Sequence, residues 1–249
     1  MKHLEGRVAL VTGSARGMGA AIAERLAREG AAVAINYSKS EQEAQAVAER
    51  IRSSQGTATV IKADLGNPEQ AKALVARTVS ALGRLDILVN NAGTTIFAPI
   101  EAIDSEQIRA QFAVNVEGKI FATQAAVPHL PREGGRIINI TGMVQLHPFP
   151  SASVYAAAFG ATDALTRTWA KELAPRGVTV NAVGAGPVET DGFNAISTAE
   201  MKQLFISRTP LGRLGMPSDI ADVVAFLASQ DARWVTGQVL LVNGGFTTL

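Results

Sequence analysis

The stretch Thr12-Gly13-Ser14-Ala15-Arg16-Gly17-Met18-Gly19 comes directly after the apolar run Val8-Ala9-Leu10-Val11, and a helical pattern follows over residues 20–29. Glycines at this spacing let the backbone turn tightly and approach a pyrophosphate, while a helix N-terminus offers free amides and positive potential. Glycines also serve ordinary turns. Here the loop stands between a strand and a helix, which favours a dinucleotide-binding loop.

Short apolar runs alternate with longer periodic segments along the whole chain. Apolar spacing typical of helices recurs at Ala44, Val47, Ala48 and Ile51, for example. Seven runs are short, continuous and rich in β-branched residues, as strands covered on both faces should be: residues 8–11, 32–35, 59–61, 87–89, 137–140, 178–180 and 239–242. The alternation predicts an α/β fold with a doubly wound, Rossmann-like parallel sheet and helices on both faces.

Domain organisation and helix boundaries can also be predicted. No internal repeat, low-complexity tract or linker-like run interrupts the chain, so we expect a single domain over residues 1–249. Asn67 and Pro68 form a good N-cap and first-turn pair, and Ser218 is expected to open the last long helix. The segment 187–210 departs from the alternation and is expected to be a mobile substrate lid.

The composition excludes several classes of function. The formal net charge is +1, so no electrostatic footprint for nucleic acid or an anionic membrane is present. The chain has no cysteine, which excludes disulfides and thiolate metal sites, and we expect no metal. No apolar run reaches signal-peptide or membrane-spanning length. A soluble cytoplasmic protein with a small-molecule partner is the expectation.

Six motifs in order make the chain resemble the short-chain dehydrogenase/reductase family. The glycine loop is the first, and the others are Asp64-Leu65, Asn90-Asn91-Ala92-Gly93, Asn115-Val116-Glu117-Gly118, Asn181-Ala182-Val183 and Val242-Asn243-Gly244-Gly245. The resemblance implies a homotetramer or homodimer. It also implies cofactor contacts from Gly13, Ser14, Arg16, Gly17, Met18, Gly19, Asn36, Tyr37, Ser38, Asp64, Leu65, Asn91, Ala92, Gly93, Gly186, Val188 and Thr190.

Charge favours NADP(H) over NAD(H). NAD-specific members usually place a carboxylate at the end of the second strand to hold the ribose hydroxyls. That place is Asn36-Tyr37-Ser38-Lys39 here, without a carboxylate to repel a 2′-phosphate. Arg16 is expected to pair with that phosphate. The alternative is that Arg16 and Lys39 are only solvated surface charges.

The catalytic set implied by the resemblance is incomplete. Tyr155 and Asn115 stand at their expected places, but the serine position is Gly142 and the lysine position is Phe159. The tyrosine is the proton donor in such sites, and a free phenol has a pKa near ~10. Phe159 supplies no cation and should raise that pKa further. Losing one acid–base contribution costs about 10²–10⁴-fold in rate, so we expect impaired reduction.

Four residues near the missing groups are candidates to replace them. Thr141 is expected to point away from the site, Lys119 to be a solvated charge on a helix surface, and Lys171 to lie far from the ribose. Histidine is a residue type suited to proton transfer near neutral pH, so His147 is either catalytic or a packing residue.

The replacements at residues 142 and 159, together with Ala185 where the family usually has a proline, predict a remodelled active site. The remodelling arose either by natural divergence or by design. The leading function is an NADP(H)-dependent oxidoreductase acting on an apolar carbonyl or alcohol, impaired or repurposed. The alternatives are an NADP(H)-binding protein without redox turnover and a non-redox enzyme with an enlarged apolar pocket.

Overall fold

The predicted apolar runs form one seven-stranded parallel sheet in the order β3-β2-β1-β4-β5-β6-β7. The computed structural model describes residues 2–248, so residues 1 and 249 of the predicted domain lie outside it. The order reverses between β1 and β4, which makes the carboxyl ends of these strands the switch point where α/β folds bind ligands. The strands are β1 Val8–Val11, β2 Ala32–Tyr37, β3 Ala58–Lys62, β4 Ile87–Asn90, β5 Arg136–Gly142, β6 Thr179–Ala185 and β7 Val239–Val242.

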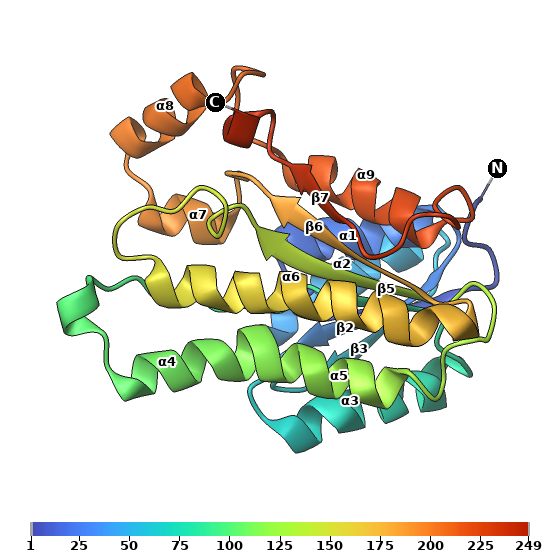
Figure 1. The fold of residues 1–249 in the computed structure, drawn as a ribbon. Helices are drawn as coiled ribbons and strands as arrows, with labels where there is room; N and C mark the ends of the chain where they lie inside the picture. The colour runs from blue at the N-terminus through green and yellow to red at the C-terminus, as the bar shows by residue number, and fades with distance from the viewer. Residues whose placement is uncertain (1, 249) are drawn as a thin grey trace.

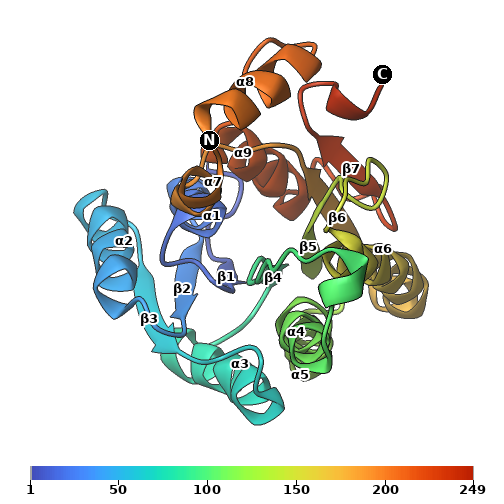
Figure 2. The same ribbon diagram turned by 90° about the vertical axis from the view of Figure 1, so that its left-hand side faces the viewer.

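Helices cover both faces of this sheet, as the alternation predicts (Figures 1 and 2). One face packs against α1 (Gly17–Arg28), α2 (Glu41–Ser53) and α9 (Pro217–Ala228). The other packs against α3 (Pro68–Leu82), α5 (Gly118–Ala126) and α6 (Ser153–Leu173). The remaining helical segments are α4 (Ser105–Phe112), the π-helical turn Ala113–Glu117, α7 (Asp191–Ile196), α8 (Ala199–Arg208), and the 3-10 turns Ile100–Ala102, Ala174–Arg176 and Phe246–Thr248.

Helix boundaries differ slightly from the sequence expectation. The Asn67 side chain accepts hydrogen bonds from Glu69 N and Gln70 N, which confirms it as the N-cap of α3. The last long helix begins at Pro217, so Ser218 does not open it. The first-turn acid Asp219 instead accepts a 2.7 Å bond from Met216 N. Similarly, α1 begins at Gly17 within the glycine loop, three residues before the apolar pattern starts.

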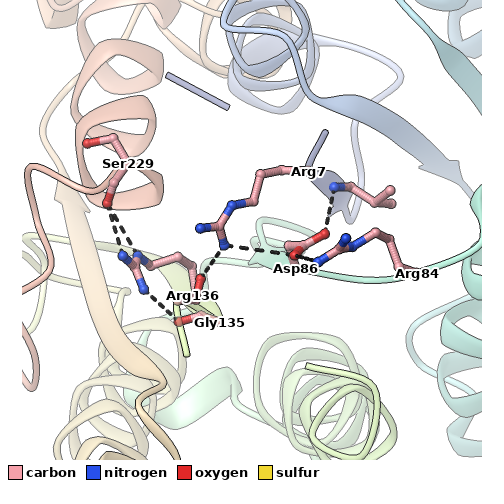
Figure 3. A network of polar contacts seen from close by, with 8 residues as sticks. Arg7, Arg84, Asp86, Gly135, Arg136 and Ser229 are labelled. Atoms are coloured by element: carbon pink, nitrogen blue, oxygen red, sulfur yellow. Dashed lines mark hydrogen bonds and ion pairs between the residues drawn. The ribbon is translucent and has the colours of Figure 1, made fainter. Parts of the chain in front are cut away.

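A charge network around buried Asp86 and Arg136 lies at the amino ends of the strands (Figure 3). Asp86 has no solvent exposure and accepts a 2.8 Å bond from Arg84, with Arg7 3.8 Å away. Arg136 begins β5, is also buried, and donates to the carbonyl oxygen of Ser229 at the end of α9. A cation at a helix C-terminus complements the helix dipole. The network therefore ties β1, β4, β5 and α9 together.

The segment 187–210 lies between β6 and α9 and contains α7 and α8 with no strand between them. In Figures 1 and 2 these two helices stand out from the layered body of the domain. This geometry matches the predicted break in the alternation, and the role of the segment as a lid stays a prediction. None of the helices between residues 2 and 248 is both long enough and apolar enough to cross a membrane.

Candidate active site

The glycine loop packs too closely for side chains. Gly13 has φ +61°, and a Cβ built on it would come 2.9 Å from Cα of Ala92. A Cβ on Gly19 would come 2.4 Å from the carbonyl oxygen of Gly13. Such distances require the backbone itself to move, so only glycine fits. The loop therefore has the tight turn and the helix N-terminus that a pyrophosphate requires.

Two predicted cofactor residues hold this loop from inside. Asn36 is buried, and its Oδ1 accepts a 3.0 Å bond from Gly13 N. The Ser14 hydroxyl donates to Val11 O at 2.7 Å and accepts from Asn36 N at 3.0 Å. Because these polar atoms are bonded within the protein, Ser14 and Asn36 support the loop by fixing its shape.

Thr12 is a functional residue that the sequence reasoning missed. Its hydroxyl accepts bonds of 2.9 Å from the backbone amides of Asn91 and Ala92 and donates to Val89 O. The Asn91 side chain returns two bonds, to the carbonyl oxygens of Thr12 and Gly13. The signal available in the sequence is a hydroxyl residue at the end of a buried strand, directly before a glycine.

The other predicted cofactor residues gather at the carboxyl ends of the strands. Arg16 is exposed, and no ion pair between residues 2 and 248 involves it. Thr190 caps α7 through a bond from Phe193 N, and its methyl group lies 3.5 Å from a Cβ built on Gly17. The start of the 187–210 segment therefore lies against the glycine loop. Exposed Ser38, Asp64 and Gly93, partly buried Met18, Ala92 and Gly186, and buried Tyr37, Leu65 and Val188 complete the set.

Asn115 lies in the π-helical turn between α4 and α5 and is buried. Its side chain makes two bonds of 2.8 Å with one residue, accepting from Thr94 N and donating to Thr94 O. Its own carbonyl oxygen accepts from the hydroxyl of Thr162 on α6. Asn115 thus holds the irregular segment that follows β4 through Thr94.

Tyr155 lies in the first turn of α6 and is partly buried. Burial raises the pKa of its phenol, and a side-chain hydrogen bond with Thr95 offsets part of that rise. The Tyr155 ring lies 4.4 Å from the ring of Phe159 and 5.8 Å from that of Phe97, between centroids. The phenol therefore stands in an apolar setting that favours its protonated form.

Phe159 also occupies the place next to Gly142. A Cβ built on Gly142 would come 2.6 Å from Cε2 of the Phe159 ring. The two catalytic positions that depart from the family pattern, residues 142 and 159, are thus in direct contact. The ring fills the space that a serine side chain would need, so an enlarged pocket is not found at this point.

Lys119 corrects one expectation, because it is buried and not a solvated surface charge. It has 4% exposure, and its Nζ donates to Ile140 O at 2.7 Å. The Nζ also lies 5.7 Å from the centre of the Phe159 ring. Burial lowers the pKa of Lys119 to about 7, although nearby Asp163 raises it in part. The sequence pattern missed this because α5 packs under α6 on that side.

The remaining candidate substitutes are Thr141, Lys171 and His147. Thr141 is buried, and the expected direction of its hydroxyl, away from the site, stays a prediction. Lys171 is exposed on α6. The His147 ring contacts the ring of Phe246 edge-on, with 5.1 Å between centroids. That contact agrees with the packing interpretation, and a catalytic role for His147 stays untested.

Similarity to known proteins covers nearly the whole chain. A family model described as enoyl-(acyl carrier protein) reductase matches residues 13–247. An uncharacterised oxidoreductase of Methylorubrum extorquens is 49% identical, over 98% of this chain and 99% of that protein. Versicolorin reductase 1 of Aspergillus parasiticus is 39% identical, over 98% and 97%. The crystal structure of a short-chain dehydrogenase from Burkholderia cenocepacia in complex with NADP gives a TM-score of 0.94 at 40% identity, over 99% and 100%. The chain belongs to the short-chain dehydrogenase/reductase family.

Proposed function

We propose that this protein is by descent an NADP(H)-dependent oxidoreductase for a small apolar carbonyl or alcohol, with impaired or repurposed proton transfer. One observation carries the proposal: the phosphate loop is intact while the Phe159 ring stands against Gly142 and Tyr155. The cofactor half of the site matches the family, and the half that handles the proton departs from it.

The residues at the strand ends fit NADP(H). The turn at Gly13 and the start of α1 suit a pyrophosphate, and the exposed guanidinium of Arg16 suits a 2′-phosphate. The Burkholderia cenocepacia relative is described in complex with NADP, which supports the same choice here. When bound, the cofactor supplies or accepts the hydride. Gly186, Val188 and Thr190 are proposed to complete its binding site.

Tyr155 is the proposed residual acid, giving its proton to the carbonyl oxygen of the substrate. No ammonium group stands at residue 159 to lower its pKa, and burial raises that pKa. A higher pKa weakens the driving force for proton transfer, so turnover falls. Asn115 supports the site by fixing Thr94.

A second candidate is a protein that binds NADP(H) without redox turnover. The replacements at residues 142 and 159 favour it, because both remove polar groups from the reacting centre. Non-redox chemistry, the third alternative, is favoured less, since the Phe159 ring fills the space where the enlarged pocket is expected.

Homo-oligomerisation is also proposed, because exposed apolar side chains offer a surface for a second copy of the chain. Trp234 is 97% exposed, and Leu241 is 39% exposed on the edge strand β7.

The test is NADPH oxidation against a panel of carbonyl compounds, run beside the double variant Gly142→Ser, Phe159→Lys, with NADPH binding measured for both proteins. The proposal expects binding in both and faster turnover in the double variant. Binding without any turnover in the parent would favour the second candidate. Equal turnover in the two proteins would contradict the assigned effect of Phe159, and absence of NADPH binding would overturn the proposal.

A further inference from the structure

Aromatic side chains are scarce in this protein, and most of them gather near Tyr155 and the segment 187–210. Aromatic residues make up 5% of the chain, and nine of them are phenylalanines. Six of these nine lie in two rows of touching rings. The two rows are Phe149, Phe97, Tyr155 and Phe159, and His147, Phe246, Phe205 and Phe193.

The first row leads to the proposed proton donor. Its ring centroids are separated by 5.4 Å from Phe149 to Phe97, 5.8 Å on to Tyr155 and 4.4 Å on to Phe159. Phe97 and Phe149 are 40% and 43% exposed, so part of each ring is accessible to a bound molecule. The row therefore offers aromatic surface to a molecule whose carbonyl group approaches Tyr155.

The second row joins the 187–210 segment to the end of the chain. Its centroids are separated by 5.8 Å from Phe193 to Phe205, 5.9 Å on to Phe246 and 5.1 Å on to His147. Phe193 and Phe205 belong to α7 and α8. The loop 143–150 contributes one ring to each row, His147 to the second and Phe149 to the first. The two rows therefore meet at this loop.

Neither row belongs to the buried clusters on the two faces of the sheet, although Phe246 itself is buried. The buried clusters on the two faces of the sheet consist mainly of alanine, valine, isoleucine and leucine. Exposed apolar side chains continue the surface around the rings, namely Ile96, Leu146, Ile196, Met201 and Leu204. The loop 143–150 contains no aspartate, glutamate, lysine or arginine. Apart from His147, whose ring packs against Phe246, no side chain in this loop could pair with a charged substrate group.

We infer that the substrate is an uncharged, flat compound whose carbonyl or hydroxyl group is attached to an aromatic ring system. Aromatic rings prefer edge-to-face and offset contacts, and each such pair adds about 0.5–1.5 kcal/mol beyond area burial. A saturated ring of the same size buries similar area without that gain. This inference rests on the proposed function only in taking Tyr155 as the residue that the substrate carbonyl approaches.

The test compares acetophenone with cyclohexyl methyl ketone, which share one skeleton and differ in aromaticity. Calorimetry measures the Kd of each ketone for the protein saturated with NADP⁺, a complex that has no hydride to give. We expect acetophenone to bind about 2- to 10-fold more tightly. Phe97→Leu and Phe205→Leu should each reduce this ratio. Phe226→Leu is the matched control, since Phe226 is 42% exposed on α9 and outside both rows.

The outcomes separate this inference from the proposed function. Equal Kd values for the two ketones, or a ratio that Phe97→Leu and Phe205→Leu leave unchanged, would overturn the inference even if ketones are reduced. A preference for acetophenone that these variants lose and Phe226→Leu keeps would support it. That second result stands even if NADPH oxidation is never detected, in which case only the proposed redox function fails.

Discussion

The ring of Phe159 stands where a side chain at residue 142 would have to lie, with Cε2 2.6 Å and Cδ2 2.9 Å from a Cβ built on Gly142. Atoms of a real side chain do not approach so closely, so the glycine and the phenylalanine accommodate one another. The ring also contacts Tyr155 on the same helix. The loss of the serine and the loss of the lysine are therefore structurally coupled, and reversing one without the other has a cost.

Gly142→Ser alone should destabilise the protein. The new Cβ must displace a partly buried ring, and overpacking of this kind costs about 1–3 kcal/mol. Urea denaturation measures the change. Gly142→Ser combined with Phe159→Lys should recover most of the stability, since the flexible lysine vacates the ring's place. A single variant as stable as the parent would show that the ring moves freely.

Lys119 should make stability depend on pH above neutrality. Its folded pKa is about 7, against an ordinary value of 10.5, so between these values the unfolded chain binds more protons. The free energy of unfolding therefore rises with pH from about 7 toward 10. Below pH 7 the folded protein carries the full cost of burying the charged amine. The shift corresponds to about 3–5 kcal/mol. In Lys119→Met the rise should disappear, and in Lys171→Met, an exposed control, it should remain. If both variants keep the rise, the buried amine is not its source.

The fold was predictable because the information is local. Runs such as 87–89 are apolar on both faces, and only a covered parallel sheet accommodates that pattern. Motif spacing also located Tyr155 and the glycine loop. The position of Lys119 was not predictable, because a lysine on a helix appears solvated until the packing of α5 under α6 is known. The same holds for the contact between Gly142 and Phe159, which are seventeen positions apart.

The roles of side chains in the proposed cofactor site also depend on tertiary contacts that the sequence pattern does not reveal. The sequence pattern places Ser14 and Asn36 beside the cofactor, and the structure shows their polar groups bonded to the loop itself. Thr12 has the same supporting role toward Asn91 and Ala92. A sequence motif indicates which residues belong to a site, but it does not indicate what each side chain does there. Whether a side chain contacts the ligand or holds the backbone depends on where its hydrogen bonds go.

Arg16→Ala should weaken NADP⁺ binding more than NAD⁺ binding. The guanidinium is exposed and is proposed to pair with the 2′-phosphate, a charge-assisted contact of about 1.5 kcal/mol or roughly tenfold in Kd. Calorimetric titration with both dinucleotides measures the ratio. Arg28→Ala removes an exposed arginine from the other end of α1 and should leave the ratio unchanged. Equal losses for NADP⁺ and NAD⁺ would assign the preference to another residue.

Tyr155 should give carbonyl reduction an almost flat pH profile between pH 6 and 9. Burial holds the pKa of the phenol above its ordinary value of 10, so the acid stays protonated across this range. Phe159→Lys, by placing a cation near the phenol, should lower that pKa and bring a decline of activity into the range. Tyr155→Phe should lower the rate of residual turnover by about 10²–10⁴-fold and leave the Kd for NADPH unchanged.

A parent profile that instead changes steeply between pH 6 and 7.5 would contradict this assignment of the acid. The group responsible would then titrate near neutrality, as a histidine can and as buried Lys119 does with its pKa of about 7. Because His147 lies on the loop 143–150 that also carries Phe149, His147→Gln is the variant that decides the matter. If it abolishes the pH dependence and the activity together, the proton comes from His147, and its contact with Phe246 serves to aim the ring. If His147→Gln changes neither and Lys119→Met removes the pH dependence, buried Lys119 is its source, and Tyr155 remains the proton donor assigned to this site.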